Sequence, residues 1–341
     1  MAALPFYFFP QLFFMRRLLL IVALASAFVF GAQADEFTRH KHLVEHVTSQ
    51  GCAYCPWGDH ILELLGEMRS DIARVSIHGN QGASDVFRTF KSSALIDFLG
   101  ATAMPSAAFD RTPYQGVLMQ VVSAYPADHQ AKAEFFSDQL DNNITTPVLA
   151  DVVIDVLYND TTRLLQVMVN GDVTDNFQAT FGNDVTLTVY LIEDSLVARQ
   201  LNGTEWVEDF VHNNVFRDAM SNYKGDALKW NETATHYTNE YKLTLKTAWV
   251  VENMSVIAFV SRNTTAYRNV INCQMLHLRD LIQQPVLGDV NGDGQVDISD
   301  VNAVINMMLG KVDKVDAADI NGDGNIDISD VNSVINIMLG K

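Results

Sequence analysis

The spacing of hydrophobic and polar residues changes twice between residue 38 and the C-terminus. Over residues 38–142, short apolar runs alternate with stretches in which apolar residues recur every three or four positions, as on one face of a helix. The pattern predicts strands at 42–48, 74–78 and 106–109 and helices at 56–66, 85–99 and 128–142. Strands that alternate with helices are typical of an α/β layer fold.

Residues 145–284 have a different pattern, with runs rich in Val, Thr, Leu and Tyr that alternate between apolar and polar positions. The predicted strands are 148–158, 164–173, 184–193, 241–250, 254–262 and 269–278. Turn sequences such as Asn159-Asp160 and Gly182-Asn183 separate them. Many short alternating strands predict a β-sandwich, and 209–229 interrupts them as a loop-rich or helical insertion.

The tail is a repeat, because 18 of the 23 positions in 289–311 are identical in 319–341. Each copy begins with Asp-x-Asn-Gly-Asp-Gly-x-x-Asp-Ile-Ser-Asp and continues with apolar residues spaced as one helix face. We expect Ser299 to cap the first helix and Gly310 to end it. No comparable helix precedes either loop.

The repeated loop has the spacing of a calcium site. Such a loop places oxygen ligands at positions 1, 3, 5, 7, 9 and 12, with Gly at position 6 for the turn. The expected ligands of the first ion are Asp289, Asn291, Asp293, Gln295 (through its carbonyl), Asp297 and Asp300. Those of the second are Asp319, Asn321, Asp323, Asn325 (through its carbonyl), Asp327 and Asp330. Hard oxygen donors favour Ca²⁺, so we expect two calcium ions.

This pair of loops, each with a single following helix, resembles a type I dockerin module over residues 288–341. The resemblance implies that the tail binds a cohesin domain on a scaffold or surface protein. The family's contact positions correspond to Ile298-Ser299 and Ile328-Ser329, where small hydroxyl residues are usual. The isoleucines imply a different cohesin specificity, and the near-identity of the copies implies binding in two orientations.

A second motif, Gly51-Cys52-Ala53-Tyr54-Cys55-Pro56, stands between the first predicted strand and its helix. A helix N-terminus stabilises a thiolate, so Cys52 is a candidate nucleophile, and Cys55, about one turn later, could resolve a mixed disulfide. Two alternatives stay open: a zinc site completed by a histidine such as His46, His60 or His78, and a static disulfide that braces the turn.

A proline at the start of the third predicted strand extends the motif. With Pro105 there and Cys-x-x-Cys before the first helix, residues 35–144 resemble a thioredoxin-like domain. The resemblance implies that Pro105 lies beside Cys52 and Cys55 and shapes a peptide-binding edge. His78 ends the second strand, at the same edge, where it could tune Cys52, although a structural role is the alternative. Cys273 has a strand pattern and is expected to be a buried apolar side chain.

Residues 38–284 together resemble the outer-membrane-protein-28 family of Gram-negative bacteria. The resemblance rests on 45–56, Ile77-His78, 100–111 around Pro105, and 212–225. It implies a fold and an outer-membrane-associated location more than a reaction. We therefore expect a multidomain protein with a thioredoxin-like α/β domain at 35–144, an all-β sandwich at 145–284 and a small α-helical calcium-binding dockerin at 285–341.

The net charge disfavours some classes of partner, and the N-terminal residues predict export. The formal net charge is −18, and the chain has no basic stripe, so nucleic acid and anionic membrane surfaces are disfavoured. Residues 1–34 have Arg16-Arg17, a 13-residue apolar run and the A-x-A site 32–34 of a signal peptide, with Met15 as the expected start. A membrane anchor is the alternative. The mature chain is then exported to a compartment where disulfides form and has no transmembrane segment.

Three functions remain. The first is a surface, periplasmic or extracellular component docked to a cohesin scaffold. The second is a thiol–disulfide oxidoreductase that acts on protein thiols through Cys52, Cys55 and Pro105. The third is a non-catalytic binding protein, with a structural disulfide, in a complex for polysaccharide catabolism. Hydrolysis of polysaccharide by this chain is disfavoured, because the acidic residues Glu205, Glu208 and Asp209 lie in one segment.

Overall fold

The structure is a computed structural model that describes residues 36–81, 84–123, 128–264, 266–282, 287–292 and 295–340. The chain divides into two compact units. The first holds the described residues up to Thr247 together with Val256–Met275, and the second holds Ala248–Ser255 and Leu276–Lys341. The predicted leader, 1–34, lies outside the described residues.

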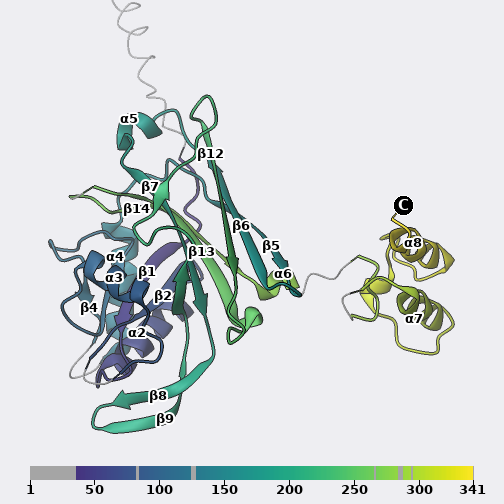
Figure 1. Ribbon diagram of the computed structural model, residues 1–341, viewed down its shortest axis with the longest axis horizontal. Coiled ribbons are helices and arrows are strands. Elements are labelled where there is room, and N and C mark those ends of the chain that lie inside the picture. The colour runs from purple at the N-terminus through teal and green to yellow at the C-terminus, as the bar shows by residue number, and fades with distance from the viewer. Residues whose placement is uncertain are drawn as a thin grey trace, which may run out of the picture. The chain divides into compact units, whose positions relative to one another are not determined.

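The first unit is built on a nine-stranded sheet of described residues (Figure 1). Its main path is β14-β13-β7-β10-β2-β1-β3-β4, and β11 pairs with β7. The strands are β1 (His42–Thr48), β2 (Ile72–His78), β3 (Ser106–Phe109), β4 (Gln120–Val121), β7 (Val185–Glu193), β10 (Val215–Ala219), β11 (Asp226–Ala227), β13 (Met254–Arg262) and β14 (Val270–His277). β1 runs parallel to β2 and antiparallel to β3.

This sheet joins residues that the sequence assigned to separate α/β and β-sandwich domains. Val215 of β10 pairs in parallel with Ser76 of β2, and β10 pairs antiparallel with β7 on its other side. The expected separation into two sheets is therefore not observed. The alternating pattern along each strand records which face is buried and carries no information about the neighbouring strand.

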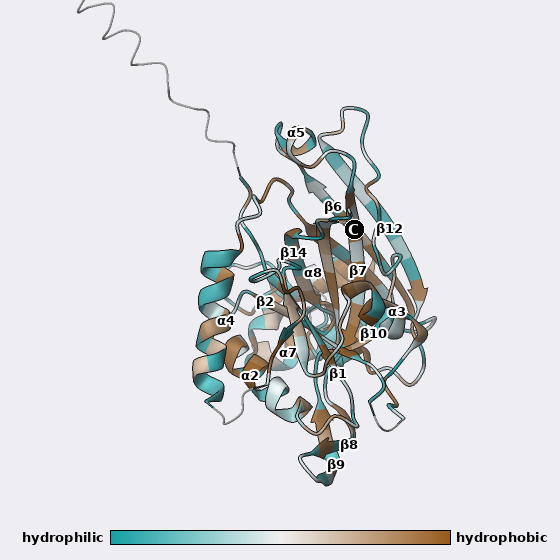
Figure 2. Ribbon diagram, turned by 90° about the vertical axis from the view of Figure 1, so that its left-hand side faces the viewer, coloured by the Kyte–Doolittle hydropathy of each residue, from teal (hydrophilic) through white to brown (hydrophobic). Residues whose placement is uncertain are grey.

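Helices cover both faces of the β1–β3 region (Figure 2). On one face, α2 (Cys55–Met68) and α4 (His129–Asn143) pack on a cluster that includes Val44 and Phe109. On the other, α3 (Phe90–Leu99) packs on a cluster with Leu43 and Val47. Successive residues of β1 point to opposite faces, so the whole strand is buried. Hydrophobic residues accordingly gather on the central strands, and much of α4 is hydrophilic (Figure 2).

Two predicted segments differ from the structure. The helix predicted at 85–99 begins at Phe90, because the Asp85 carboxylate accepts hydrogen bonds from backbone N–H groups outside a helix and Thr89 forms the N-cap with Ser92. The predicted insertion at 209–229 contains strand residues, among them β10. Its first residues belong to a two-stranded hairpin of β8 (Leu196–Asn202) and β9 (Glu205–His212).

The remaining elements of the first unit flank this sheet. A separate three-stranded antiparallel sheet has the order β12 (His236–Thr244), β6 (Leu164–Asp172), β5 (Val153–Asn159), and α5 (Phe177–Phe181) is a short helix. The mostly-β character predicted for 145–284 is confirmed.

A buried charged pair connects distant strands of the nine-stranded sheet. Glu45 on β1 accepts two hydrogen bonds of 2.7 Å from the guanidinium of Arg111, which follows β3, and Tyr190 of β7 bonds to both side chains. Both charged residues are at most 2% exposed. Burial opposes the charged guanidinium, but the charge of Glu45 holds the pKa of Arg111 above its ordinary value. The Arg111 guanidinium also lies 4.8 Å from the ring centroid of Phe259 on β13.

The second unit contains η1 (Val251–Asn253), α6 (Arg279–Ile282), α7 (Ile298–Met308), η2 (Asp316–Ala318) and α8 (Ile328–Met338). Both predicted tail helices form, and their apolar faces meet in one core with Val304 and Val334 fully buried. The predicted cap Ser299 is wrong: Asp297 and Asp327 are the N-caps, each in a capping box with the Asp three residues later. Among the residues described, no helix has the length and apolar character needed to cross a membrane.

We predict that Arg111→Met lowers the free energy of unfolding of the first unit by about 3–5 kcal/mol, because it leaves the Glu45 carboxylate buried without its counter-charge. Urea unfolding of the full chain measures this loss. The double variant Glu45→Met/Arg111→Met should recover most of it, since no buried charge remains. Equal losses in the single and the double variant would contradict a buried ion pair.

Candidate functional site

The two cysteines of the Cys-x-x-Cys motif form a disulfide at the start of α2. Cys52 lies in the turn that follows β1, and Cys55 is the first residue of the helix. The residues are 1% and 0% exposed. Both sulfur atoms are bonded to each other, so the sequence's zinc alternative is not observed. The described residues around the disulfide include no group of three or more His, Cys, Asp or Glu that could hold a metal.

Pro105, which the thioredoxin-like resemblance places beside the two cysteines, packs against the first turn of α2, the helix that begins at Cys55. Its ring packs so closely on the first turn of α2 that a Cβ on Gly58 would lie 2.7 Å from the Pro105 Cβ. The Met104–Pro105 peptide bond is cis. The loop after β2 meets the same edge of the sheet, because the Gly79 N–H donates to the Thr48 carbonyl oxygen. The turn after β1, the loop after β2 and Pro105, which precedes β3, therefore lie at the same edge of the sheet.

Residues 196–212, which we call the strap, lie against the disulfide turn. The strap comprises β8, β9 and the turn between them. Two of its backbone N–H groups donate to the turn, Leu201 to the Gln50 carbonyl oxygen and Gly203 to the Ala53 carbonyl oxygen, both at 2.8 Å. Sequence analysis did not predict this contact.

Two glutamine side chains complete the contact between strap and turn. Gln200 of β8 donates through Nε2 to the carbonyl oxygens of Ser49 at 3.2 Å and Cys52 at 3.1 Å. Gln50 donates through Nε2 to the Arg199 carbonyl oxygen at 2.8 Å. Both glutamines are at most 2% exposed. Sequence analysis missed them because an amide side chain belongs to no catalytic or metal-binding motif.

His78 makes contacts other than the predicted one with Cys52. Its Nδ1 lies 2.9 Å from Asp85 Oδ2, and its ring lies 5.4 Å from that of His212, at the end of the strap. Although burial opposes ionisation of Asp85, the hydrogen bond and charge of His78 hold the pKa of that carboxyl below its ordinary value. The predicted tuning of Cys52 by His78 remains a prediction.

A buried polar cluster lies between β1, β2 and α2. Arg74 forms an ion pair with Asp59, and the Nδ1 of His46 lies 3.4 Å from an Asp59 oxygen. Burial, with the charges of Arg74 and His78, holds the pKa of His46 well below its ordinary value. A cavity of about 10 Å³ lies between Asp59, Arg74 and His212. This is about the room that one water molecule requires.

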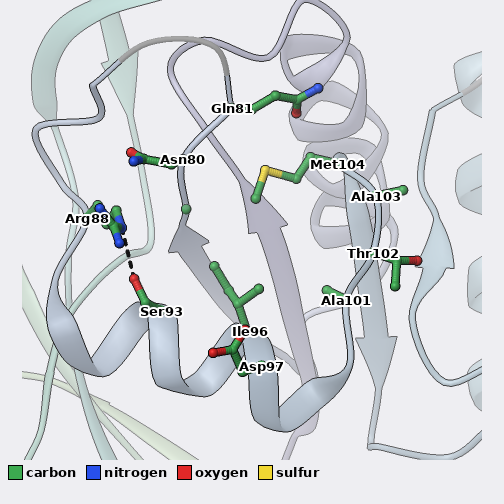
Figure 3. Close-up of a pocket in the computed structure, with 11 residues that line it drawn as sticks. Asn80, Gln81, Arg88, Ser93, Ile96, Asp97, Ala101, Thr102, Ala103 and Met104 are labelled. Carbon is green, nitrogen blue, oxygen red and sulfur yellow. Dashed lines mark hydrogen bonds between the residues drawn. The ribbon is translucent and has the colours of Figure 1, made fainter.

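A larger cavity of about 480 Å³ lies beside Met104 (Figure 3). Met104 and Ile96 meet over Gly79, where a Cβ would lie 2.6 Å from Met104 Cε and 2.8 Å from Ile96 Cδ1. Polar side chains surround this apolar contact, among them Arg88, which donates to Ser93 Oγ. The cavity opens near the residue that precedes Pro105.

In the second tail loop, backbone N–H groups surround the carboxylates. Asp319 accepts hydrogen bonds from the N–H groups of Gly322, Asp323 and Gly324. Asp330, which is fully buried, accepts from those of Ile320, Asn321 and Asp327. The loop's first and last expected ligands therefore hold its two ends and its turn together.

The first tail loop repeats this arrangement where it is described. Asp300 is fully buried and accepts from the N–H groups of Val290, Asn291 and Asp297. Asp293, another expected ligand, lies outside the described residues. The donor set of both loops fits calcium, because it consists of carboxylate, amide and carbonyl oxygens without sulfur or imidazole.

Other candidate residues lie apart from these sites. Cys273 is fully buried on β14, and burial raises the pKa of its thiol well above the ordinary value, in agreement with the apolar role predicted for it. Glu205, Glu208 and Asp209 are exposed on β9.

Comparison with known proteins gives two family matches. Residues 92–280, more than half of the chain, match the family model of outer membrane protein Omp28, and residues 287–339 match that of the dockerin type I domain. No curated protein matches the chain.

Two solved structures from Porphyromonas gingivalis are similar. HBP35 has a TM-score of 0.57 at 17% sequence identity, over 71% of this chain and 76% of that chain. A domain of the outer membrane lipoprotein Omp28 has a TM-score of 0.27 at 19% identity, over 38% of this chain and 87% of that chain. The likeness to HBP35 shows a shared fold.

We predict that the free energy of unfolding falls between pH 7 and pH 5, partly through His212. Burial and the neighbouring His78 lower the pKa of His212 to about 4. An unfolded histidine takes up a proton near pH 6.5. The contribution of neutral His212 to stability is therefore complete above that pH and is lost as the pH falls toward 4.

Urea unfolding of the wild type and of His212→Gln at several pH values measures this contribution. Between pH 7 and pH 5, the free energy of unfolding of the variant should fall by about 1 kcal/mol less than that of the wild type. An identical pH dependence in the two proteins would show that His212 is accessible to protons in the folded chain.

Proposed function

The chain belongs to the outer membrane protein Omp28 family, and from this premise we propose that it is an exported, surface-associated protein that docks through its dockerin to a cohesin. The observation that carries the proposal is the duplicated loop and helix of residues 287–339, which match the dockerin type I domain. The family supports an outer-membrane or cell-surface location.

The proposed calcium sites use the residues expected from the loop spacing. Asp289, Asn291, Asp293, Gln295, Asp297 and Asp300 would hold one ion, and Asp319, Asn321, Asp323, Asn325, Asp327 and Asp330 the other. Calcium would supply positive charge among carboxylates that otherwise repel one another. The chain's own contribution is the ring of backbone N–H groups that holds Asp300 and Asp330 in place.

The proposed cohesin contact surface includes the start of each tail helix. Ile298 and Ile328 occupy equivalent positions and are 62% and 61% exposed. Each is followed by a serine, Ser299 or Ser329, whose hydroxyl donates to the N-cap aspartate. Two equivalent apolar and hydroxyl pairs support docking in either of two orientations.

We predict that docking requires calcium and the ligand set. The full chain should capture a cohesin-containing protein from the envelope of its own cells in about 2 mM calcium and lose it in excess chelator, because a vacant loop leaves its carboxylates uncompensated. The variant Asp289→Ala/Asp319→Ala should fail to capture it in calcium.

Asp316→Ala is the matched control, because Asp316 is exposed in η2, outside both loops, and this variant should bind as the wild type does. Calorimetric titration of the full chain with calcium should give two ions per chain. Capture that is equal in calcium and in chelator would contradict the proposal.

A second candidate function is thiol–disulfide exchange, favoured by the position of the disulfide at a helix N-terminus beside Pro105. In the reduced protein, the Cys52 thiolate would attack a disulfide of a protein substrate, form a mixed disulfide and release one substrate thiolate. Cys55 would then attack Cys52 Sγ, restore the Cys52–Cys55 disulfide and release the second thiolate. The cavity beside Met104 offers room for a substrate side chain.

The alternative is a non-catalytic binding protein of a polysaccharide-degrading surface complex, in which the disulfide is structural. The nearly complete burial of Cys52 and Cys55 favours it. A reduction potential below about −300 mV is typical of structural disulfides and would support this alternative.

We predict, for the exchange function, that the chain accelerates reduction of insulin by dithiothreitol and that Cys52→Ser removes the acceleration, because the attacking thiolate is lost. Cys273→Ser is the control, since Cys273 lies apart from the disulfide and is fully buried. Equal turbidity curves for wild type and Cys52→Ser would rule this function out.

A further inference from the structure

The strap is hydrogen-bonded to the turn that carries the disulfide. Cys52 and Cys55 lie at a turn between a strand and a helix, where a sheet edge would ordinarily leave them open to solvent. They are instead 1% and 0% exposed. A reductant must approach a sulfur atom directly, because exchange requires attack on that sulfur. The buried disulfide therefore cannot react until the residues that bury it move.

Within the described residues, the strap is not part of a larger sheet. Its two strands form a separate two-stranded sheet, whose residues pair only with each other among the described ladders. Its outward residues are exposed, including Val197 at 62% and Val211 at 50%. A two-stranded ribbon with one face in solvent has marginal stability, and such segments open at lower free energy than the core does.

The base of the strap is fixed. The Asn214 N–H donates to Asp194 Oδ1 at 2.6 Å, and the Ser195 N–H donates to Asn213 Oδ1 at 2.9 Å, so the two chain segments that enter and leave the strap are tied together. Ser195 and Asn214 have φ values of 61° and 56°. These left-handed residues mark the points where the chain turns into and out of the ribbon.

Hydrogen bonds attach the tip of the strap to the disulfide turn. They come from the backbone N–H groups of Leu201 and Gly203 and from the amides of Gln50 and Gln200. Gln200 matters most, because one buried Nε2 donates to carbonyl oxygens on both sides of the turn, at Ser49 and at Cys52. Its Oε1 makes no hydrogen bond.

We propose that the strap, residues 196–212, is a gate that shields the Cys52–Cys55 disulfide when its tip is attached and exposes the sulfur atoms when the tip lifts about its base. Gln200 is the positioning residue that holds the gate closed. This device does not depend on cohesin docking or on exchange activity, since it concerns only the access of a reagent to the disulfide.

The test measures how fast dithiothreitol reduces the disulfide in the full-length folded chain. Dithiothreitol becomes a cyclic disulfide, Cys52 and Cys55 become thiols, and iodoacetamide traps them for peptide mass spectrometry. Cys273 is an internal reference, because it is fully buried and reacts only if the fold opens. Gln200→Met keeps the length of the side chain and removes its donor.

We expect the wild-type disulfide to be reduced at least about tenfold more slowly than the same disulfide in a peptide of residues 49–58, and Gln200→Met to raise the rate about tenfold while Cys273 stays unmodified. Glu208→Ala is the matched control on the exposed side of the strap and should react as the wild type does. Equal rates for wild type and Gln200→Met, or a wild-type rate equal to that of the peptide, would overturn the proposal.

A second variant decides the outcome if Cys273 is also modified in Gln200→Met, which would indicate that this substitution opens the fold. Gln50→Glu removes the donor to the Arg199 carbonyl oxygen and keeps the oxygen that accepts from the Val86 N–H. Labelling of Cys52 and Cys55 that is faster than in the wild type, while Cys273 stays unmodified, supports the gate. A wild-type rate in this variant, or labelling of all three cysteines together, overturns it.

Discussion

The pairing of Glu45 with Arg111 is the interaction on which the architecture of the first unit depends. Two charges at most 2% exposed can remain in a protein interior only as close partners, and here Tyr190 and the ring of Phe259 complete their surroundings. These residues come from β1, from the end of β3, from β7 and from β13. The pair therefore requires that the helix-covered strands and the later β-strands form together, as the shared sheet also does through β2 and β10.

This shared sheet determines where the disulfide lies and what can cover it. β10 begins beside Ser76, near the end of β2, and the chain turns at Asn214, so the segment that precedes β10 brings His212 next to His78, where the loop after β2 begins. The strap is that segment, and its amide groups reach the disulfide turn. A Cys-x-x-Cys at a helix N-terminus has the position of a reactive pair, while its burial is that of a structural one. A movable cover accommodates both observations in one molecule.

The sequence predicted the elements whose pattern is local. The ranges 42–48, 106–109 and 254–262 agree with β1, β3 and β13, and the tail loops and helices follow from their repeat. The sequence did not predict the β10–β2 pairing, because hydrophobic alternation shows which face is buried and not which strand is adjacent. The sequence also did not predict the contacts of Gln50 and Gln200, because both side chains donate to backbone carbonyl groups. The carbonyl groups that Gln200 contacts, those of Ser49 and Cys52, are 151 and 148 residues away in the sequence.

The nine-stranded sheet folds as one cooperative structure rather than as two domains, and native-state hydrogen exchange of the full chain tests this. We expect the slowest amides of β1 and those of β7 and β13 to exchange with the same free energy of opening, and Arg111→Met to lower that free energy by the same amount in all three strands. Amides of β1–β4 that open at a distinctly lower free energy than those of β7 and β13, and that alone respond to the substitution, would contradict it.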